Sequence, residues 1–135
     1  MQQIEGYIIS GTGRGSKFIS MPVYSDIFSS LLEALPYPGT LNIKLDEKYV
    51  EIVNRYFEIG TKFDNLSTNG KQTGGIIVNH FYLTIDDNDC LCIGVRPLLT
   101  EHHTDVLEIV SQHFLRNKLE LQNNSRLTLN ITEKL

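Results

Sequence analysis

The sequence predicts a single mainly β domain with short helices, whose strands close into a barrel or a curled sheet. Short runs of β-forming residues alternate with turn residues along most of the 135-residue chain. Only two stretches have clear apolar stripes at helical spacing, and residues 1–135 contain no repeat, linker or low-complexity tract. A sheet of many short strands protects its edges best by closing on itself.

The first elements are predicted from β formers, glycines and prolines. Residues 4–10 are rich in β formers and predict a strand, and the alternate glycines in 11–16 predict a loop. Residues 17–21 predict a second, short strand. A helix is expected over 22–35, because Pro22 suits a first turn and apolar residues recur at helical spacing.

The rest of the chain continues the alternation of short strands and turns. Pro36-Tyr37-Pro38-Gly39 ends the first helix, and residues 57–62 are ambiguous. The remaining predicted elements are, in chain order, a strand over 40–45, a helical turn or two over 47–56, a flexible loop over 64–70, strands over 75–80, 81–85 and 90–95 with an acidic turn at 86–89, a helix over 105–114 and a final strand over 126–132.

Charge and composition exclude several classes of function. The chain has 12 basic and 16 acidic residues, a net charge of −4, so no overall basic field attracts a nucleic-acid backbone. No secretory signal is visible at the N-terminus, and no apolar run approaches the ~18 residues of a membrane span. Cys90 and Cys92 are expected to be small buried apolar residues rather than a disulfide framework or metal site. We therefore expect a cytoplasmic monomer that binds neither nucleic acid nor membrane.

The first candidate motif is the glycine segment Gly11-Thr12-Gly13-Arg14-Gly15-Ser16-Lys17. Glycines let backbone N–H groups approach an anion closely, and Arg14 and Lys17 add positive charge. The spacing differs from that of a Walker A loop, and the expected strand after it argues against a dinucleotide fingerprint. By itself the segment is explained almost equally well by a tight turn.

The second candidate motif is Pro38-Gly39-Thr40-Leu41-Asn42. On a strand, Thr40 and Asn42 point to the same face, so a hydroxyl and an amide oxygen could bind Mg²⁺ together with phosphate and water. By spacing alone, a strand whose polar face meets solvent is the preferred interpretation.

The third candidate motif runs from Arg96 to Glu108 and continues over residues 113–116. Adjacent histidines such as His102 and His103 seldom face the same metal ion, so a loop is favoured there. Glu108 lies off the apolar stripe of the expected helix and by default is solvated. Arg116 ends that helical region, where a cation suits the helix dipole.

Together these three features resemble, in order and spacing, the archaeal CTP-dependent riboflavin kinase family. The resemblance covers about residues 5–131, nearly the whole chain. The matching segments are Tyr37 with Pro38-Gly39-Thr40-Leu41-Asn42, the opening Gly6, Ser10-Gly11-Thr12-Gly13-Arg14-Gly15 and Phe18, and the later Thr100, His102, Glu108-Ile109, Leu115-Arg116, Leu119 and Leu121. Each motif alone is weak, but the three in order are fairly specific.

The resemblance implies a six-stranded cradle-loop (Greek-key-like) β-barrel and a phosphoryl transfer. Members of the family move the γ-phosphoryl group of CTP to the 5′-hydroxyl of riboflavin, which gives FMN and CDP, with Mg²⁺ as cofactor. The family commonly has an acidic residue in the glycine loop, where this chain has Arg14. That reversal bears on phosphate contact and on the choice of nucleotide.

The resemblance also implies roles for individual residues. Thr40 and Asn42 would bind Mg²⁺, and Thr100 and Glu108 would contact the flavin. Glu108 is also the best candidate for a catalytic role, namely orienting the riboflavin 5′-hydroxyl. The implied nucleotide-binding residues are Gly11, Thr12, Gly13, Arg14, Gly15, Ser16, His113, Phe114, Leu115 and Arg116.

Two other classes of function compete with a kinase. The same barrel could hold a flavin or a nucleotide without turning it over, although the Thr40 and Asn42 pair argues against this. A small β domain could also bind DNA, but the net charge of −4 and the lack of a basic stripe count against that. The aromatic residues Tyr24, Phe28 and Tyr37 could offer apolar walls to a flavin ring, but a plain core role is favoured.

Overall fold

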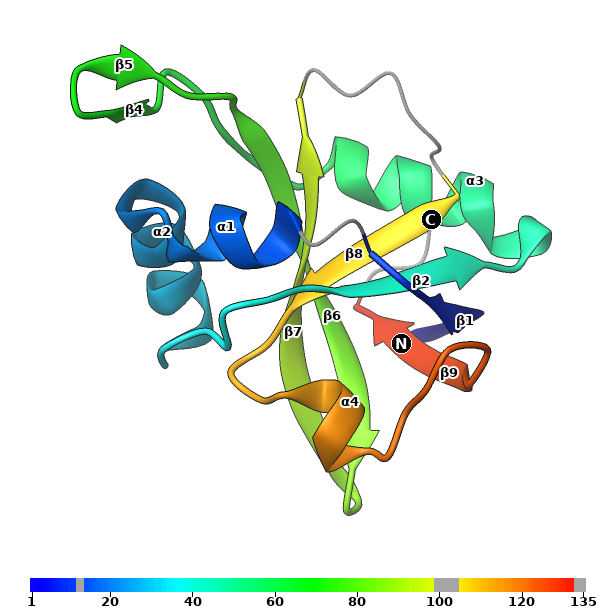
Figure 1. The fold of residues 1–135 in the computed structure, drawn as a ribbon. Coiled ribbons are helices and arrows are strands. Elements are labelled where there is room, and N and C mark those ends of the chain that lie inside the picture. The colour runs from blue at the N-terminus through cyan, green and yellow to red at the C-terminus, as the bar shows by residue number, and fades with distance from the viewer. Residues whose placement is uncertain (12–13, 99–104, 133–135) are drawn as a thin grey trace.

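The computed structural model contains an antiparallel β-barrel with short helices outside it (Figure 1). It describes residues 1–11, 14–98 and 105–132. Around the barrel the strands follow the order β6 (Ile76–Ile85), β7 (Asn88–Pro97), β8 (Val106–Val110), β2 (Leu41–Leu45), β1 (Gln2–Ile9) and β9 (Arg126–Ile131). The pairing of Tyr82 in β6 with Asn130 in β9 closes this ring of six strands. The predicted mainly β barrel with short helices is confirmed.

Three further strands lie outside the ring. β3 (Thr61–Phe63) pairs with the first residues of β6, from Ile76 to Val78. β4 (Ser67–Thr68) and β5 (Lys71–Gln72) form a small hairpin that projects from the barrel (Figure 1). Asn69 and Gly70 have φ angles of 52° and 77°, the left-handed values that a tight two-residue hairpin turn requires.

The helices pack on two regions of the barrel. α1 (Arg14–Ser20) and α2 (Pro22–Leu32) cover the outer face of β6 and β7, where Tyr24 and Phe28 pack with Val78 and Ile93. α3 (Glu47–Glu58) packs with the residues of the barrel interior through Val53 and Phe57. The fourth helix is one short turn, α4 (Leu115–Lys118).

The barrel interior accounts for the alternating patterns in the strands. In β2, Leu41, Ile43 and Leu45 are buried in this interior, whereas Asn42 and Lys44 between them point the other way. The same alternation runs through β1, β8 and β9. The predicted strands over 4–10, 40–45 and 126–132 and the predicted helical segment over 47–56 therefore correspond to real elements.

The predicted strand over 17–21 is wrong, because most of these residues belong to helix α1. Phe18 packs on Tyr24 and Phe28 of the next helix, with ring centroids 4.2 and 6.0 Å apart, and Ile19 is buried. Residues 17–21 are too few to show whether their apolar residues follow helical or strand spacing, so contacts between α1 and α2 determine their conformation. The glycine segment is thus followed by a helix, not by a strand.

The predicted helix over 105–114 is also wrong. Val106–Val110 forms strand β8, which fills the place between β7 and β2 in the barrel. Its β-branched residues favour a strand, and pairing on both edges outweighs the helical spacing of Val106, Ile109 and Val110. The strands expected separately over 75–80 and 81–85 form one strand, β6, and the loop expected over 64–70 contains β4 and its turn.

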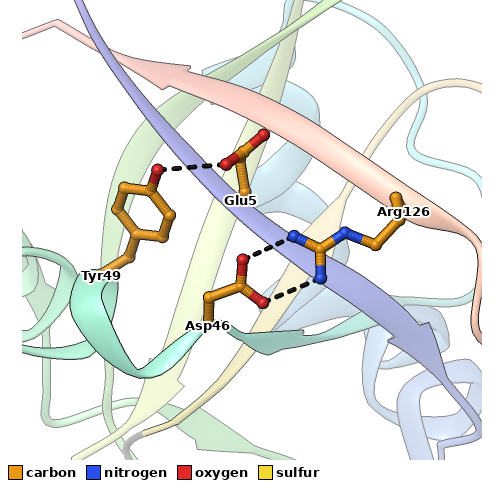
Figure 2. Close-up of polar contacts among 4 residues, drawn as sticks. All are labelled: Glu5, Asp46, Tyr49 and Arg126. Atoms are coloured by element: carbon orange, nitrogen blue, oxygen red, sulfur yellow. Dashed lines mark hydrogen bonds and ion pairs between the residues drawn. The ribbon is translucent and has the colours of Figure 1, made fainter.

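Polar contacts join β1, β9 and the beginning of α3 (Figure 2). Arg126 donates to both carboxylate oxygens of Asp46, at 2.9 and 2.5 Å, and Tyr49 donates its hydroxyl to Glu5 at 3.1 Å. The bidentate guanidinium holds the pKa of Asp46 below its ordinary value. These contacts connect the outside of the barrel to the helix that packs against its core.

The two cysteines of the chain do not form a disulfide. Cys92 is buried and Cys90 is half-buried, and both thiols are free. Within residues 1–11, 14–98 and 105–132, no three His, Cys, Asp or Glu side chains gather into a metal-binding group. None of the helices in these residues has the length and apolar character needed to cross a membrane.

Candidate active site

A pocket of about 910 Å³ lies on the outer face of β2 and β8. Its walls come from the end of β1, the beginning of α1, residues 37–42, the end of β7, β8 and the turn that follows β8. A pocket of this volume is large enough for a small-molecule ligand. All three sequence motifs border this pocket, although they lie far apart along the chain.

The glycine segment approaches the second motif closely. A Cβ atom at Gly11 would collide with the side-chain amide of Asn42, and a Cβ atom at Gly15 would collide with the hydroxyl of Thr40. Glycine at these two positions lets the backbone lie directly against the two polar side chains. Backbone groups and side-chain oxygens are thus brought together at one end of the pocket.

Thr40, Asn42 and Glu108 form a polar cluster on the pocket wall. Asn42 in β2 is the register partner of Glu108 in β8, and the Thr40 hydroxyl donates a 2.8 Å hydrogen bond to the Glu108 carboxylate. The inward residues Leu41 and Ile109 hold the two strands in this orientation. The polar side chains of this cluster therefore line a pocket rather than an open solvated strand face.

The Glu108 carboxylate is half-buried, and its environment differs from that of a surface acid. Burial raises the pKa of Glu108 above its ordinary value, and the hydrogen bond from Thr40 offsets part of the rise. Among the described residues, its side-chain partner is a neutral hydroxyl and not a cation. The cluster can therefore interact favourably with a positive ion or a hydrogen-bond donor in the pocket.

The turn after β8 forms another wall. Phe114 is 45% exposed, yet it stacks on Tyr37 with centroids 4.6 Å apart and an interplanar angle of 5°. The Tyr37 N–H donates to the Ser111 carbonyl, which fastens the second motif to this turn. Arg116 donates to the Ile9 carbonyl at 3.1 Å, next to the glycine segment. An aromatic surface and a cation thus border the same pocket.

The structure brings most of the sequence-predicted site residues together. Gly11, Gly15, Ser16, Thr40, Asn42, Glu108, His113, Phe114, Leu115 and Arg116 all line the pocket. Thr12, Gly13 and Thr100 lie outside the described residues, and Arg14 is the first residue of α1. Glu108 contacts Thr40, which lies against Gly15, so the third motif and the glycine segment meet at the same part of the pocket.

The sequence assigns no individual role to two other residues that line the pocket, Arg96 and Ser111. Arg96 lines the pocket and lies over the Phe57 ring, 4.3 Å from its centroid, and burial lowers its pKa. Ser111 is buried and accepts a hydrogen bond from the N–H of His113. Neither residue has a spacing that points to a site. Tyr24 and Phe28 belong to the core between α2 and the barrel, as favoured, whereas Tyr37 lines the pocket.

Comparison with known proteins agrees with the arrangement of these motifs. Residues 8–131 match the model of a family described as a domain of unknown function, DUF120, whose short name is that of a CTP-dependent riboflavin kinase. Among named proteins, the riboflavin kinase of Pyrobaculum islandicum is 34% identical over 96% of this chain and 60% of its own length. That of Methanococcus aeolicus is 31% identical over 92% of this chain and 94% of its own length.

The relatives differ in length. The riboflavin kinase of Methanosarcina mazei is 28% identical over 98% of this chain but only 57% of its own length. The chain thus spans between half and two thirds of several curated relatives, and nearly all of others. The family match covers both the glycine segment and the turn that follows β8. This chain therefore belongs to the CTP-dependent riboflavin kinase family.

Proposed function

We propose that this protein transfers the γ-phosphoryl group of CTP to the 5′-hydroxyl of riboflavin, giving FMN and CDP. The observation that carries the proposal is the convergence of the glycine segment, the Thr40 and Asn42 pair and Glu108 on one pocket. Membership of the CTP-dependent riboflavin kinase family supports riboflavin and CTP as the two substrates. The relative from Methanococcus aeolicus, matched over 94% of its length, supports testing this chain by itself.

The nucleotide is assigned to the end of the pocket bordered by the glycine segment and Arg116. Backbone N–H groups next to glycines can approach phosphate oxygens closely, and a guanidinium binds them with charge-assisted hydrogen bonds. Both features line the pocket, and Arg116 contacts the carbonyl of Ile9 just before the glycine segment. His113, Phe114 and Leu115 would complete this part of the site.

A magnesium ion is the expected cofactor, and the residues present fit it. Thr40, Asn42 and Glu108 offer only oxygen donors of hydroxyl, amide and carboxylate type, which Mg²⁺ prefers, with phosphate and water completing the shell. Because the Thr40 hydroxyl donates its hydrogen bond to Glu108, lone pairs of its oxygen remain available to a cation. Bound there by Thr40 and Asn42, the ion would neutralise charge on the transferring phosphoryl group.

Riboflavin is assigned to Glu108 and Thr100. A half-buried carboxylate whose side-chain partner among the described residues is a hydroxyl can accept a strong hydrogen bond from a ribityl hydroxyl. Phosphoryl transfer depends more on positioning and charge neutralisation than on a strong base. Glu108 is therefore proposed to orient the attacking 5′-hydroxyl toward the phosphoryl group, and Thr100 to help hold the flavin.

The direct test is to incubate the pure protein with riboflavin, Mg²⁺ and each of the four nucleoside triphosphates, and to measure FMN. We expect FMN with CTP and little with ATP. If ATP, GTP or UTP gave FMN at the same rate as CTP, the protein would still be a riboflavin kinase, but the assignment of CTP as donor would be wrong. If riboflavin and CDP bind and no triphosphate gives FMN under varied metal conditions, the barrel is a binding module and not a kinase.

A further inference from the structure

Asn123 lies outside every motif considered so far, yet its side chain joins two walls of the pocket. Its Oδ1 atom accepts a 3.0 Å hydrogen bond from Arg116, and its Nδ2 atom donates a 2.7 Å hydrogen bond to the Ser10 hydroxyl. Ser10 and Arg116 both line the pocket, and Ser10 directly precedes Gly11. One amide thus connects the cation of the turn after β8 with the beginning of the glycine segment.

The orientation of this amide follows from its partners. A guanidinium has only donors, so the oxygen of Asn123 must face Arg116 and the nitrogen must face Ser10. The same Nη2 nitrogen of Arg116 also donates to the Ile9 carbonyl at 3.1 Å. Both hydrogens of that nitrogen therefore donate within the protein. The N–H groups on Nε and Nη1 of the guanidinium are the ones that can donate to a ligand.

The backbone around Asn123 is fastened to the same strand. The Asn124 N–H donates to the Ile8 carbonyl at 2.8 Å, and the Ile8 N–H donates to the Ser125 carbonyl at 2.9 Å. These bonds bring the segment before β9 against the end of β1, and Asn123 extends the contact past the strand to Ser10. The amide therefore acts from a fixed backbone rather than from a free loop.

We infer that Asn123 is a positioning residue for nucleotide binding. It fixes the position of the Arg116 guanidinium relative to the start of the glycine segment. The inference rests on the proposed function. Asn123 is not among the residues that line the pocket, and it acts through Ser10 and Arg116. Anion sites built from two separate walls lose affinity when the walls shift, because each donor must already point at the ligand.

The test compares Asn123→Ala with a matched control, Asn117→Ala. Asn117 is exposed on α4, and its side chain makes no hydrogen bond within the described residues. CDP and riboflavin affinities are measured by calorimetry, and thermal stability is measured in parallel. We expect Asn123→Ala to weaken CDP binding about three- to tenfold, with riboflavin binding and the melting temperature nearly unchanged. Asn117→Ala should bind both ligands like the wild type.

A second variant separates positioning from general stability. Ser10→Ala cuts only the contact to the glycine segment, so its CDP affinity should fall less than that of Asn123→Ala. The double variant should match Asn123→Ala alone, because the Ser10 contact is already lost there. Equal losses for both ligands, or additive losses in the double variant, would overturn the inference.

The wild-type titration keeps the two proposals apart. If the wild type binds CDP and Asn123→Ala binds it equally well, the positioning role is wrong and the proposed kinase stands. If the wild type binds no CDP with or without Mg²⁺, the proposed function is wrong and this inference falls with it.

Discussion

Two carboxylates on the barrel, Asp46 and Glu108, have opposite surroundings. Asp46 receives both arms of the Arg126 guanidinium, and its pKa is held below the ordinary value. Glu108 receives a neutral hydroxyl, and burial raises its pKa. Asp46 is neutralised by a cation of its own chain, whereas among the described residues the burial of Glu108 is offset only in part, by the Thr40 hydroxyl.

The difference separates a structural polar contact from a site. A half-buried acid without a cation is stabilised when a ligand brings a positive ion or a donor to it. The Asp46 contact ties β9 to the beginning of α3 (Figure 2). Neither Asp46 nor Arg126 is among the residues that line the pocket. Both groups are carboxylates on the barrel. What distinguishes them is the partner of each, a guanidinium for Asp46 and a hydroxyl for Glu108.

The largest expected effect comes from the amide beside Glu108. Asn42→Ala removes an oxygen proposed to bind Mg²⁺, so FMN formation should fall by orders of magnitude while the fold remains intact. The control is Asn130→Ala, because Asn130 lies on β9 and does not line this pocket. Steady-state FMN synthesis over a range of Mg²⁺ concentrations measures both. Normal turnover of Asn42→Ala at low Mg²⁺ would remove this residue from the metal site.

The next effect concerns the carboxylate itself. Glu108→Gln keeps the size of the side chain but loses the charge, and hydrogen bonds to charged groups are worth about 1.5–3 kcal/mol. Riboflavin affinity should therefore fall roughly ten- to a hundredfold. CDP binding measured without Mg²⁺ should barely change. Calorimetric titration with each ligand tests this, and unchanged riboflavin binding would show that the flavin lies elsewhere.

A smaller effect is expected for Thr100→Ala. Thr100 lies outside the described residues, and its role comes from the family resemblance alone. Losing one neutral hydrogen bond, worth about 0.5–1.5 kcal/mol, should weaken riboflavin binding about three- to tenfold. The same titration measures it. A loss of CDP affinity equal to the loss of riboflavin affinity would instead indicate a disturbed fold.

The two acids should also change stability with opposite pH dependence. The pKa of folded Asp46 is lowered, so its stabilising effect is present at neutral pH and disappears as the solution is acidified through that pKa; Asp46→Asn should lower the melting temperature at pH 7. The pKa of folded Glu108 is raised, so ionisation of this carboxylate costs more in the folded than in the unfolded protein. The cost is absent below the ordinary glutamate pKa of about 4 and complete above the folded pKa. Glu108→Gln should therefore raise the melting temperature at pH 7.

Melting curves from pH 3 to pH 8 distinguish these cases. Toward the acidic end of the range each variant should approach the wild type, from below for Asp46→Asn and from above for Glu108→Gln. A Glu108→Gln protein that melts lower than the wild type at pH 7 would mean that the carboxylate is already compensated within the chain.

Alternation along the strands made much of the fold predictable. Leu41, Ile43 and Leu45 reveal β2 because the buried and polar positions alternate without interruption. The run Val106–Val110 is too short to distinguish the helical period of 3.6 residues from the strand period of two. Its pairing with β7 and β2 makes it a strand. The helix α1 was missed for the same reason, since contacts with α2 fix it.

The site itself was less predictable from spacing. The hydrogen bond from Thr40 to Glu108 joins residues 68 positions apart, and nothing local marks either partner. The glycines of the first motif lie against Thr40 and Asn42 only because β1 and β2 are neighbours in the barrel. The resemblance to a family grouped these motifs, and the fold provides the physical reason that they meet.

The closure of the barrel has a consequence for its motions. β7 pairs along the full length of one edge of β6. β3 and β9 both pair with the other edge, and β9 does so through the single residue pair Tyr82 and Asn130. Strand separations cost least where the fewest backbone bonds break, so the barrel should open first between β6 and β9. No residue of either strand lines the pocket. Transient opening, which exposes amides to solvent exchange, would thus spare the four-stranded wall β7, β8, β2 and β1 that carries the proposed chemistry.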